Sequence, residues 1–231
     1  FIYNSTYNNM KLVDRFLDVI APYNCVNCGL EGSLLCQSCQ LDACDTLPSR
    51  CYRCKKLTQD FAVCEKCRHN SSLKHVWVRS EYNEVAKKLI YSTKCKSARE
   101  GAGVIAMLMT ELLPVFSADT TVVHIPSAAE RKRQRGYDHA EYIARKLARN
   151  SNLNFQKILG RHGNARQVGA TREVRLKQLQ GAFYVKNSNI KDKHILLVDD
   201  IVTTGGTLEA AAKVLRQAGA KQIDAVVFAQ K

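Results

Sequence analysis

Two adjacent acids and a glycine–threonine turn follow a strongly apolar run near the carboxyl end of the sequence. The stretch ILLVDDIVTTGGTL covers residues 195–208 and places Asp199 and Asp200 directly after four apolar residues. Ligands of parallel α/β sheets bind beyond the carboxyl ends of the strands, so we expect both acids to lie at such an edge. Their carboxylates suit sugar hydroxyls or a divalent cation, because their oxygens accept hydrogen bonds and bind hard cations.

The turn that follows the acids suits a phosphate group. It consists of Thr203, Thr204, Gly205, Gly206 and Thr207, and a helical pattern comes next. Glycine lets the backbone approach a ligand closely, and the unpaired N–H groups of a helix N-terminus attract anions. A phosphate beside a diol is a ribose 5-phosphate, which is the ligand that the stretch predicts. The simpler interpretation is that Thr203 or Thr204 only caps a helix and that the acids only end a strand.

The cysteines indicate metal chemistry in the other half of the chain. Nine of the ten lie between Cys25 and Cys67, and eight of these form four C-x2-C pairs. Two such pairs make a closed tetrahedral zinc site, which is structural rather than catalytic. A disulfide framework would need an oxidising compartment, and no export signal is apparent. The ligands are Cys25, Cys28, Cys36, Cys39, Cys51, Cys54, Cys64 and Cys67. Their short spacers favour two sites of consecutive pairs, with interleaved pairing as the alternative.

Strand and helix patterns alternate downstream of Trp77. We expect strands at residues 74–82, 120–126, 182–186, 194–200 and 222–229, and helices at 83–91, 99–113, 137–150 and 206–218. A short strand near 155–159 and a long loop over 160–175 complete the pattern. The alternation predicts an α/β fold with a mostly parallel sheet covered by helices on both faces. The composition changes near Ser71, so we expect a cysteine-rich domain at 1–72, with an amphipathic helix around 12–20, and an α/β domain at 73–231.

The chain is strongly basic, with 35 Lys and Arg against 21 Asp and Glu and a formal charge of +14. This charge suits anionic partners, although a solvated basic surface is the simpler explanation. One cluster, Arg131, Lys132, Arg133 and Arg135, follows a predicted strand. We expect it at a helix start, where cations oppose the helix dipole and so imply a bound anion. A second basic face on the second cysteine half comprises Arg50, Arg53, Lys55, Lys56, Lys66 and Arg68.

The stretch VDDIVTTGGT resembles the phosphoribosyl pyrophosphate (PRPP) motif of type I phosphoribosyltransferases. Four cysteine knuckles ahead of such a domain resemble the ComF family of competence proteins. The segment around Lys94 and the stretches HIPSAAERKRQRGYDHA and ARQVGATREVRLKQLQGAF fit the same family. The resemblance implies a type I phosphoribosyltransferase-like fold behind a double zinc ribbon. It also implies that Asp199 and Asp200 hold the ribose hydroxyls, that residues 203–207 hold the 5-phosphate, and that Mg²⁺ accompanies PRPP.

Contacts to pyrophosphate or DNA are expected from the basic residues Lys94, Arg131, Arg133, Arg135 and Arg175. Two positions depart from the patterns of the relatives. Hypoxanthine-type enzymes carry an acid where this chain has Thr203, which argues against purine salvage. Asp138 and His139 stand where ComF relatives usually have Asn and Gln. The loop that contains Arg161, Arg166 and Arg172 is predicted to be a flap over the site.

Three functions fit these observations. The first is a cytoplasmic DNA-handling factor of natural transformation, which contacts single-stranded DNA or a DNA-translocating helicase and binds PRPP. The second is an active phosphoribosyltransferase whose acceptor and catalytic residues remain unidentified, because no base-recognising acid stands out. The third is a PRPP-gated regulatory adaptor. No apolar run reaches the ~18 residues of a membrane span, so we expect no membrane insertion.

Overall fold

The computed structural model describes residues 23–43, 46–94, 98–162, 181–186 and 189–231. The predicted amphipathic helix around residues 12–20 lies outside these ranges, as do Arg166, Arg172 and Arg175 of the predicted flap. Within them, no helix is both long and apolar enough to cross a membrane.

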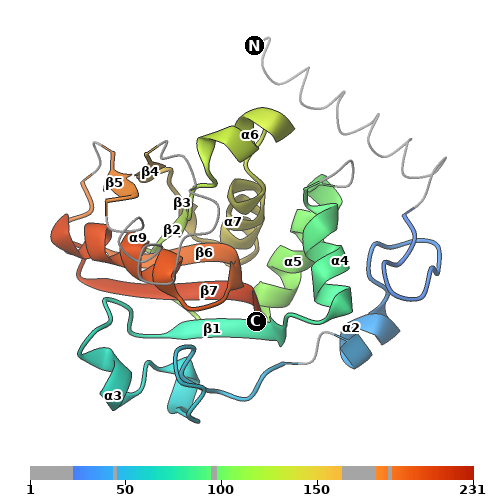
Figure 1. The fold of residues 1–231 in the computed structure, drawn as a ribbon, viewed down its shortest axis with the longest axis horizontal. Helices are drawn as coiled ribbons and strands as arrows, with labels where there is room; N and C mark the ends of the chain where they lie inside the picture. Colours follow the sequence, from blue (N-terminus) through green and yellow to red (C-terminus); the bar gives the residue numbers. More distant parts are fainter. Residues whose placement is uncertain (1–22, 44–45, 95–97, 163–180, 187–188) are drawn as a thin grey trace, which may run out of the picture.

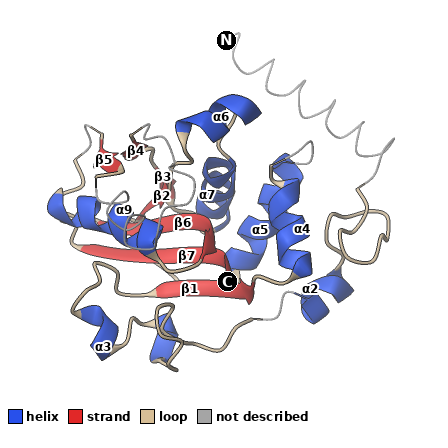
Figure 2. Ribbon diagram, viewed as in Figure 1, coloured by secondary structure: helices blue, strands red, loops and turns tan. Residues whose placement is uncertain are grey.

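A parallel five-stranded sheet in the order β1-β7-β6-β2-β3 forms the centre of the structure (Figures 1 and 2). Its strands are β1 (Val76–Glu81), β2 (Thr121–His124), β3 (Asn154–Phe155), β6 (His194–Val202) and β7 (Gln222–Gln230). A separate antiparallel pair joins β4 (Leu159–Arg161) to β5 (Phe183–Val185). The strands expected at 74–82, 120–126, 182–186, 194–200 and 222–229 are therefore present, and β6 continues two residues beyond the predicted end at Asp200. The single short strand expected near 155–159 is wrong, because β3 ends at Phe155 and β4 begins at Leu159 and reaches into the predicted loop.

Helices cover both faces of the sheet, as the alternating pattern predicted. The helices of the body are α4 (Glu84–Ser92), α5 (Ala98–Thr110), α6 (Ala129–Arg135), α7 (His139–Asn150) and α9 (Gly206–Gln217). Along β6, Leu196 and Val198 pack with α4, α5 and α7, whereas Ile195 and Leu197 pack with α9. Successive strand residues point to opposite faces, so this continuously apolar run fills two cores at once.

The cysteine-rich half has little regular structure of its own and packs on both faces of the body. Its helices are α2 (Gln37–Ala43), the 3-10 turn η1 (Gln59–Phe61) and α3 (Glu65–Arg68). Cys25, Leu35 and Cys39 join the core on the α4 and α5 side, whereas Cys51 and Tyr52 join the core on the α9 side. Figure 1 accordingly draws α2 beside α4, and α3 well apart from both, below β1. The proposed domain boundary at residue 72 stays a prediction.

A buried carboxylate at the amino edge of the sheet connects β7 to β6 and to the residue that precedes β1. Asp224 in β7 has no solvent exposure. It lies 3.1 Å from Nδ1 of His75 and 2.6 Å from Nε2 of His194, and it accepts a 2.7 Å hydrogen bond from Gln222. Burial alone would raise the pKa of Asp224, but these donors hold it well below its usual range. The charge is stabilised inside the fold because several donors surround it.

Candidate functional site

The two acids of the opening motif lie on β6, close to its carboxyl end. Asp200 is buried, whereas Asp199 is partly exposed. The side chain of Asp199 accepts a 2.9 Å hydrogen bond from the backbone N–H of Asp200. The carboxyl edge of β6 is the expected ligand edge of a parallel sheet, so the acids are placed where the sequence predicted.

Asp200 is held by two basic side chains from other elements. Nζ of Lys94, just after α4, lies 3.1 Å from Oδ2, and Nε2 of His139, the first residue of α7, lies 2.9 Å from the same oxygen. Burial alone would raise the pKa of Asp200, but the hydrogen bond from His139 and the charge of Lys94 hold it well below its usual range. Asp200 is therefore a fixed carboxylate. Both contacts use Oδ2, so within the described residues Oδ1 is left for a ligand.

The pKa of Asp199 is shifted in the opposite direction to that of Asp200. Burial and the adjacent charge of Asp200 raise its pKa well above the ordinary value. The pair therefore combines one carboxylate that stays ionised with one carboxyl group that is harder to ionise. A divalent cation would shift this balance, because a positive charge favours ionisation of both groups.

His139 connects Asp200 to α6. Nη1 of Arg135 lies 3.3 Å from Nδ1 of the imidazole, whose Nε2 faces Asp200. A guanidinium only donates, so Nδ1 must accept and Nε2 must carry the proton that His139 donates to Asp200. The sequence singled out His139 only as a departure from related motifs, and nothing in it indicated contact with an acid 61 residues away.

The neighbouring departure, Asp138, has a structural role. It caps α7 by accepting a 3.2 Å hydrogen bond from the N–H of Ala140. It also accepts hydrogen bonds of 2.9 Å from both the N–H and the hydroxyl of Ser127. Asp138 thereby fixes the loop after β2 to the start of α7, which positions His139.

Replacing His139 with Ala should raise the pKa of Asp200, because the substitution removes its nearest donor and leaves Lys94 alone to offset burial. Carbon NMR of the Asp200 carboxyl across a pH titration would measure the change. Replacing His69, an exposed histidine just after α3, is the matched control and should leave the titration unchanged. An unchanged Asp200 titration in the His139→Ala variant would show that Lys94 alone keeps the acid ionised.

The turn after β6 leads into α9 without a side-chain cap. The N-cap position is Gly205, with φ of 78°, and no side chain accepts a hydrogen bond there. Thr203 and Thr204 are exposed and precede the cap. The interpretation of either threonine as a simple helix cap is therefore wrong. The uncapped amides of the first helical turn remain available to an anion.

A hollow of about 390 Å³ lies between this turn and the cysteine-rich half. Its lining residues are Arg53, Lys66, Cys67, Asn70, Thr203 and Thr204. The ring of Tyr52 packs on Gly205 so closely that a Cβ at that position would clash with it. No local pattern indicated this contact, because Tyr52 and Gly205 are far apart in the chain.

The basic cluster after β2 departs from its predicted placement. Lys132, Arg133 and Arg135 lie in the last turn of α6, and Glu130 lies in its first turn. These positions complement the helix dipole, so the argument that the cations oppose it and require an anion is wrong. The helix ends at Gly136, whose φ of 77° supplies a left-handed C-terminal stop. Arg131, Lys132 and Arg133 are exposed and form an open basic surface.

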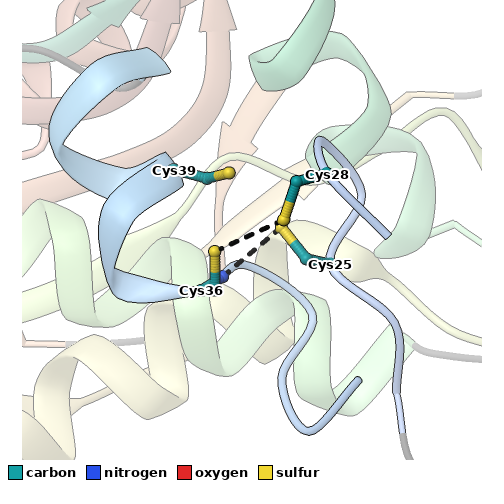
Figure 3. Close-up of side chains that lie close together, drawn as sticks. All are labelled: Cys25, Cys28, Cys36 and Cys39. Carbon is teal, nitrogen blue, oxygen red and sulfur yellow. Dashed lines mark hydrogen bonds between the residues drawn. The ribbon is translucent and has the colours of Figure 1, made fainter. Parts of the chain in front are cut away.

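The eight paired cysteines form two groups of consecutive pairs. We call the segment 25–39, with Cys25, Cys28, Cys36 and Cys39, the first cysteine unit. The segment 51–67, with Cys51, Cys54, Cys64 and Cys67, is the second cysteine unit. In each unit the ligand atoms lie within 4.8 Å of one another, as a single metal ion requires. Figure 3 shows the side chains of the first unit converging from two segments, with Cys36 Sγ 3.6 Å from Cys28 Sγ.

Backbone amides favour the thiolate of one cysteine in each unit. Burial alone would raise the pKa of Cys25, but donors from Cys28, Cys36 and Asn27 lower it to about 6. The pKa of Cys51 is likewise lowered to about 7, because backbone donors outweigh burial. Thiolates are the form that binds zinc, and four cysteine sulfurs fit a closed structural site. Both units could therefore hold zinc.

Part of the chain is similar to phosphoribosyltransferases. A family model described as phosphoribosyl transferase domain matches residues 134–231. Among solved structures, glutamine PRPP amidotransferase from B. subtilis aligns with 62% of this chain and 30% of its own, at 15% identity and a TM-score of 0.42.

Similarity to competence proteins extends over most of the chain. Competence protein ComFC of Bacillus subtilis is 28% identical, covering 80% of this chain and 79% of the relative. Competence protein ComFC of Streptococcus pneumoniae is 26% identical, covering 91% and 82%. DNA utilization protein YhgH of Escherichia coli is 24% identical, covering 75% and 86%. The chain is thus similar over most of its length to these competence and DNA utilization proteins.

Proposed function

We propose that the chain binds PRPP at the carboxyl edge of β6, with the ribose hydroxyls on Asp199 and Asp200 and the 5-phosphate on the turn at residues 203–207. The observation that carries this proposal is the pairing of a fixed carboxylate with an uncapped helix start at the same edge. Carboxylates accept from a diol and uncapped amides bind a phosphate, so each half of the site matches one half of the ligand. The match to the phosphoribosyl transferase domain supports the same ligand.

Mg²⁺ fits this site as a companion of PRPP. The two carboxyl groups of Asp199 and Asp200 are oxygen ligands, which Mg²⁺ prefers. When bound, the ion would neutralise charge on the pyrophosphate group. Two of the chain's own cations near the acids, Lys94 and Arg135, already face Asp200 and His139.

Transfer of the phosphoribosyl group to an acceptor is the second candidate, and the family match favours it. Thr203 stands where an acid recognises the base in hypoxanthine-type enzymes, so a purine is not the expected acceptor. Release of pyrophosphate from PRPP with one of a panel of acceptors would support catalysis. Tight PRPP binding without release would support a regulatory adaptor.

For the whole protein, we propose a cytoplasmic role in handling single-stranded DNA during natural transformation, alongside a DNA-translocating helicase. The names of the relatives, competence protein and DNA utilization protein, support this role. A charge of +14 supports an anionic partner. The exposed cations of α6 are the surface that we assign to the strand, because they carry no acidic partner in the described residues.

Single-stranded oligonucleotide should bind at low salt and be released as salt rises, because binding liberates counterions from the strand. Replacing Arg131, Lys132 and Arg133 with Ala should lower the slope of log affinity against log salt by about 2, since each phosphate contact contributes roughly 0.7. Fluorescence anisotropy over a salt series measures the slope.

The matched control replaces three exposed lysines elsewhere, Lys87, Lys88 and Lys213, which should leave the slope nearly unchanged. Absence of binding by the unmodified protein at low salt would rule out the DNA role. Equal slopes for both triple variants would move the DNA surface away from α6.

A further inference from the structure

The hollow beside the phosphate-binding turn is built from both halves of the chain. Thr203 and Thr204 form one wall. Arg53, Lys66, Cys67 and Asn70 form the other, and all four belong to the second cysteine unit or the turn that follows it. The first cysteine unit contributes no lining residue in the described part of the chain, because it packs with α4 and α5 on the opposite face.

The second cysteine unit is anchored directly to the helix that follows the turn. The hydroxyl of Tyr52 donates a 2.5 Å hydrogen bond to Glu209 in the first turn of α9. The backbone N–H of Ser72 donates to the other oxygen of Glu209 at 3.0 Å. Gln230 at the end of β7 donates to the carbonyl of Tyr52 at 2.6 Å.

Gly205 shows how closely the two parts fit. Its left-handed φ of 78° favours glycine, and the Tyr52 ring occupies the space of a side chain. Tyr52 itself is only 2% exposed. It lies between Cys51 and Arg53 in the knuckle, so the position of the turn depends on how that knuckle is held.

The hollow carries positive charge opposite the threonines. Nη1 of Arg53 donates a 2.8 Å hydrogen bond to the carbonyl of Asn70, which fixes the guanidinium near the cavity. Lys66 is exposed and forms no ion pair within the described residues. The nearby acid Glu209 accepts hydrogen bonds from Tyr52 and Ser72, and its Oε1 also lies 3.8 Å from Nη1 of Arg53, so it offsets part of the charge of Arg53. A phosphate in the hollow would therefore meet hydroxyls on one side and cations on the other.

We propose that the second cysteine unit forms one side of the phosphate-binding site and contacts the bound phosphate. A pentose phosphomonoester binds between Thr203–Thr204 and the cations Lys66 and Arg53, and metal in the second unit keeps that wall and the turn in place. The inference rests on the proposed sugar-phosphate site and adds to it a second set of contacts. Metal in the first unit has no part in this binding.

Two ligands carry a phosphate on a pentose and could use these contacts. One is PRPP, and the other is the 5′-terminal phosphate of a single-stranded nucleic acid. A hollow open to solvent accepts either, because the recognised group is a phosphate on a pentose. Calorimetry with PRPP and Mg²⁺, with a 5′-phosphorylated oligonucleotide and with its 5′-hydroxyl counterpart separates the two sources.

Lys66→Ala should weaken binding of the recognised phosphate about 5- to 20-fold, because a charge-assisted hydrogen bond is lost. Lys56→Ala, in the same unit but not lining the hollow, is the matched control and should bind like the unmodified protein. Cys67→Ser and Cys28→Ser should each lose one equivalent of zinc, and only Cys67→Ser should also lose phosphate affinity. Metal content and circular dichroism accompany each titration of the full-length protein.

The outcomes separate this inference from the function on which it rests. If the unmodified protein binds PRPP and the Lys66 and Cys67 variants bind it equally well, the second unit is only structural and the inference is overturned. If PRPP does not bind but the 5′-phosphorylated strand does, with the same dependence on Lys66, the phosphate contact of the second cysteine unit is supported and PRPP is not the ligand. If neither ligand binds, both are overturned. Should Cys67→Ser fail to fold, Lys66→Ala alone decides.

Discussion

Asp200→Asn should weaken PRPP binding by about 100-fold or more, because the substitution removes the one carboxylate that the fold keeps ionised at the ligand edge. A hydrogen bond to a charged group contributes about 1.5–3 kcal/mol, and Oδ1 of Asp200 is the oxygen that we assign to a ribose hydroxyl. The amide also leaves Lys94 and His139 facing a neutral group, which disorders the edge further. Isothermal titration calorimetry with PRPP and Mg²⁺ gives the affinity directly.

Asp192→Asn is the matched control for this experiment. Asp192 lies exposed in the turn before β6, with φ of 61°, a conformation that Asn adopts as readily as Asp. It undergoes the same chemical change far from the carboxyl edge and should bind PRPP normally. If Asp200→Asn binds PRPP as tightly as Asp192→Asn, the ribose hydroxyls are not on this acid.

Removing zinc should release two ions per chain and cost the protein most of its stability. A structural zinc site contributes roughly 10–16 kcal/mol of apparent binding free energy, whereas a folded domain has only about 5–15 kcal/mol in total. The cysteine-rich half has few apolar residues of its own, and its buried cysteines belong to both cores of the body. A chelator titration followed by a zinc-sensitive dye and circular dichroism measures release and unfolding together.

Single cysteine substitutions show how much each cysteine unit contributes to zinc binding and to the stability of the protein. Cys51→Ser and Cys25→Ser should each halve the zinc content and lower the melting temperature. Cys95→Ser, outside the four C-x2-C pairs, should retain both ions. Zinc content unchanged in Cys51→Ser, or folding unaffected by complete chelation, would contradict a structural role for the metal.

The sequence predicted the fold and the position of the two acids on β6 because both depend on local pattern. The run before Asp199 is apolar on both faces, as expected for a central parallel strand. Two acids and a glycine–threonine turn are adjacent in the chain, so their proximity at one edge could be deduced without the fold, and their joint use stays a prediction. The C-x2-C spacing likewise determined each knuckle and favoured pairing of consecutive knuckles.

Long-range contacts could not be predicted in the same way. His139 reaches Asp200, and Tyr52 packs on Gly205, only because the fold brings distant segments together. The placement of the two cysteine units on opposite faces of the sheet also depends on contacts between distant segments. For α6 a local signal did exist. Glu130 near the start and Gly136 just past the end mark a helix whose cations lie in its last turn.

A structure of the full-length protein with PRPP and Mg²⁺ tests the sugar-phosphate site most directly. The predicted result is the 5-phosphate on the backbone amides of residues 203–207, with the ribose hydroxyls within hydrogen-bonding distance of Asp199 and Asp200. PRPP bound elsewhere, or bound with its 5-phosphate away from Thr203–Thr207, would contradict the site.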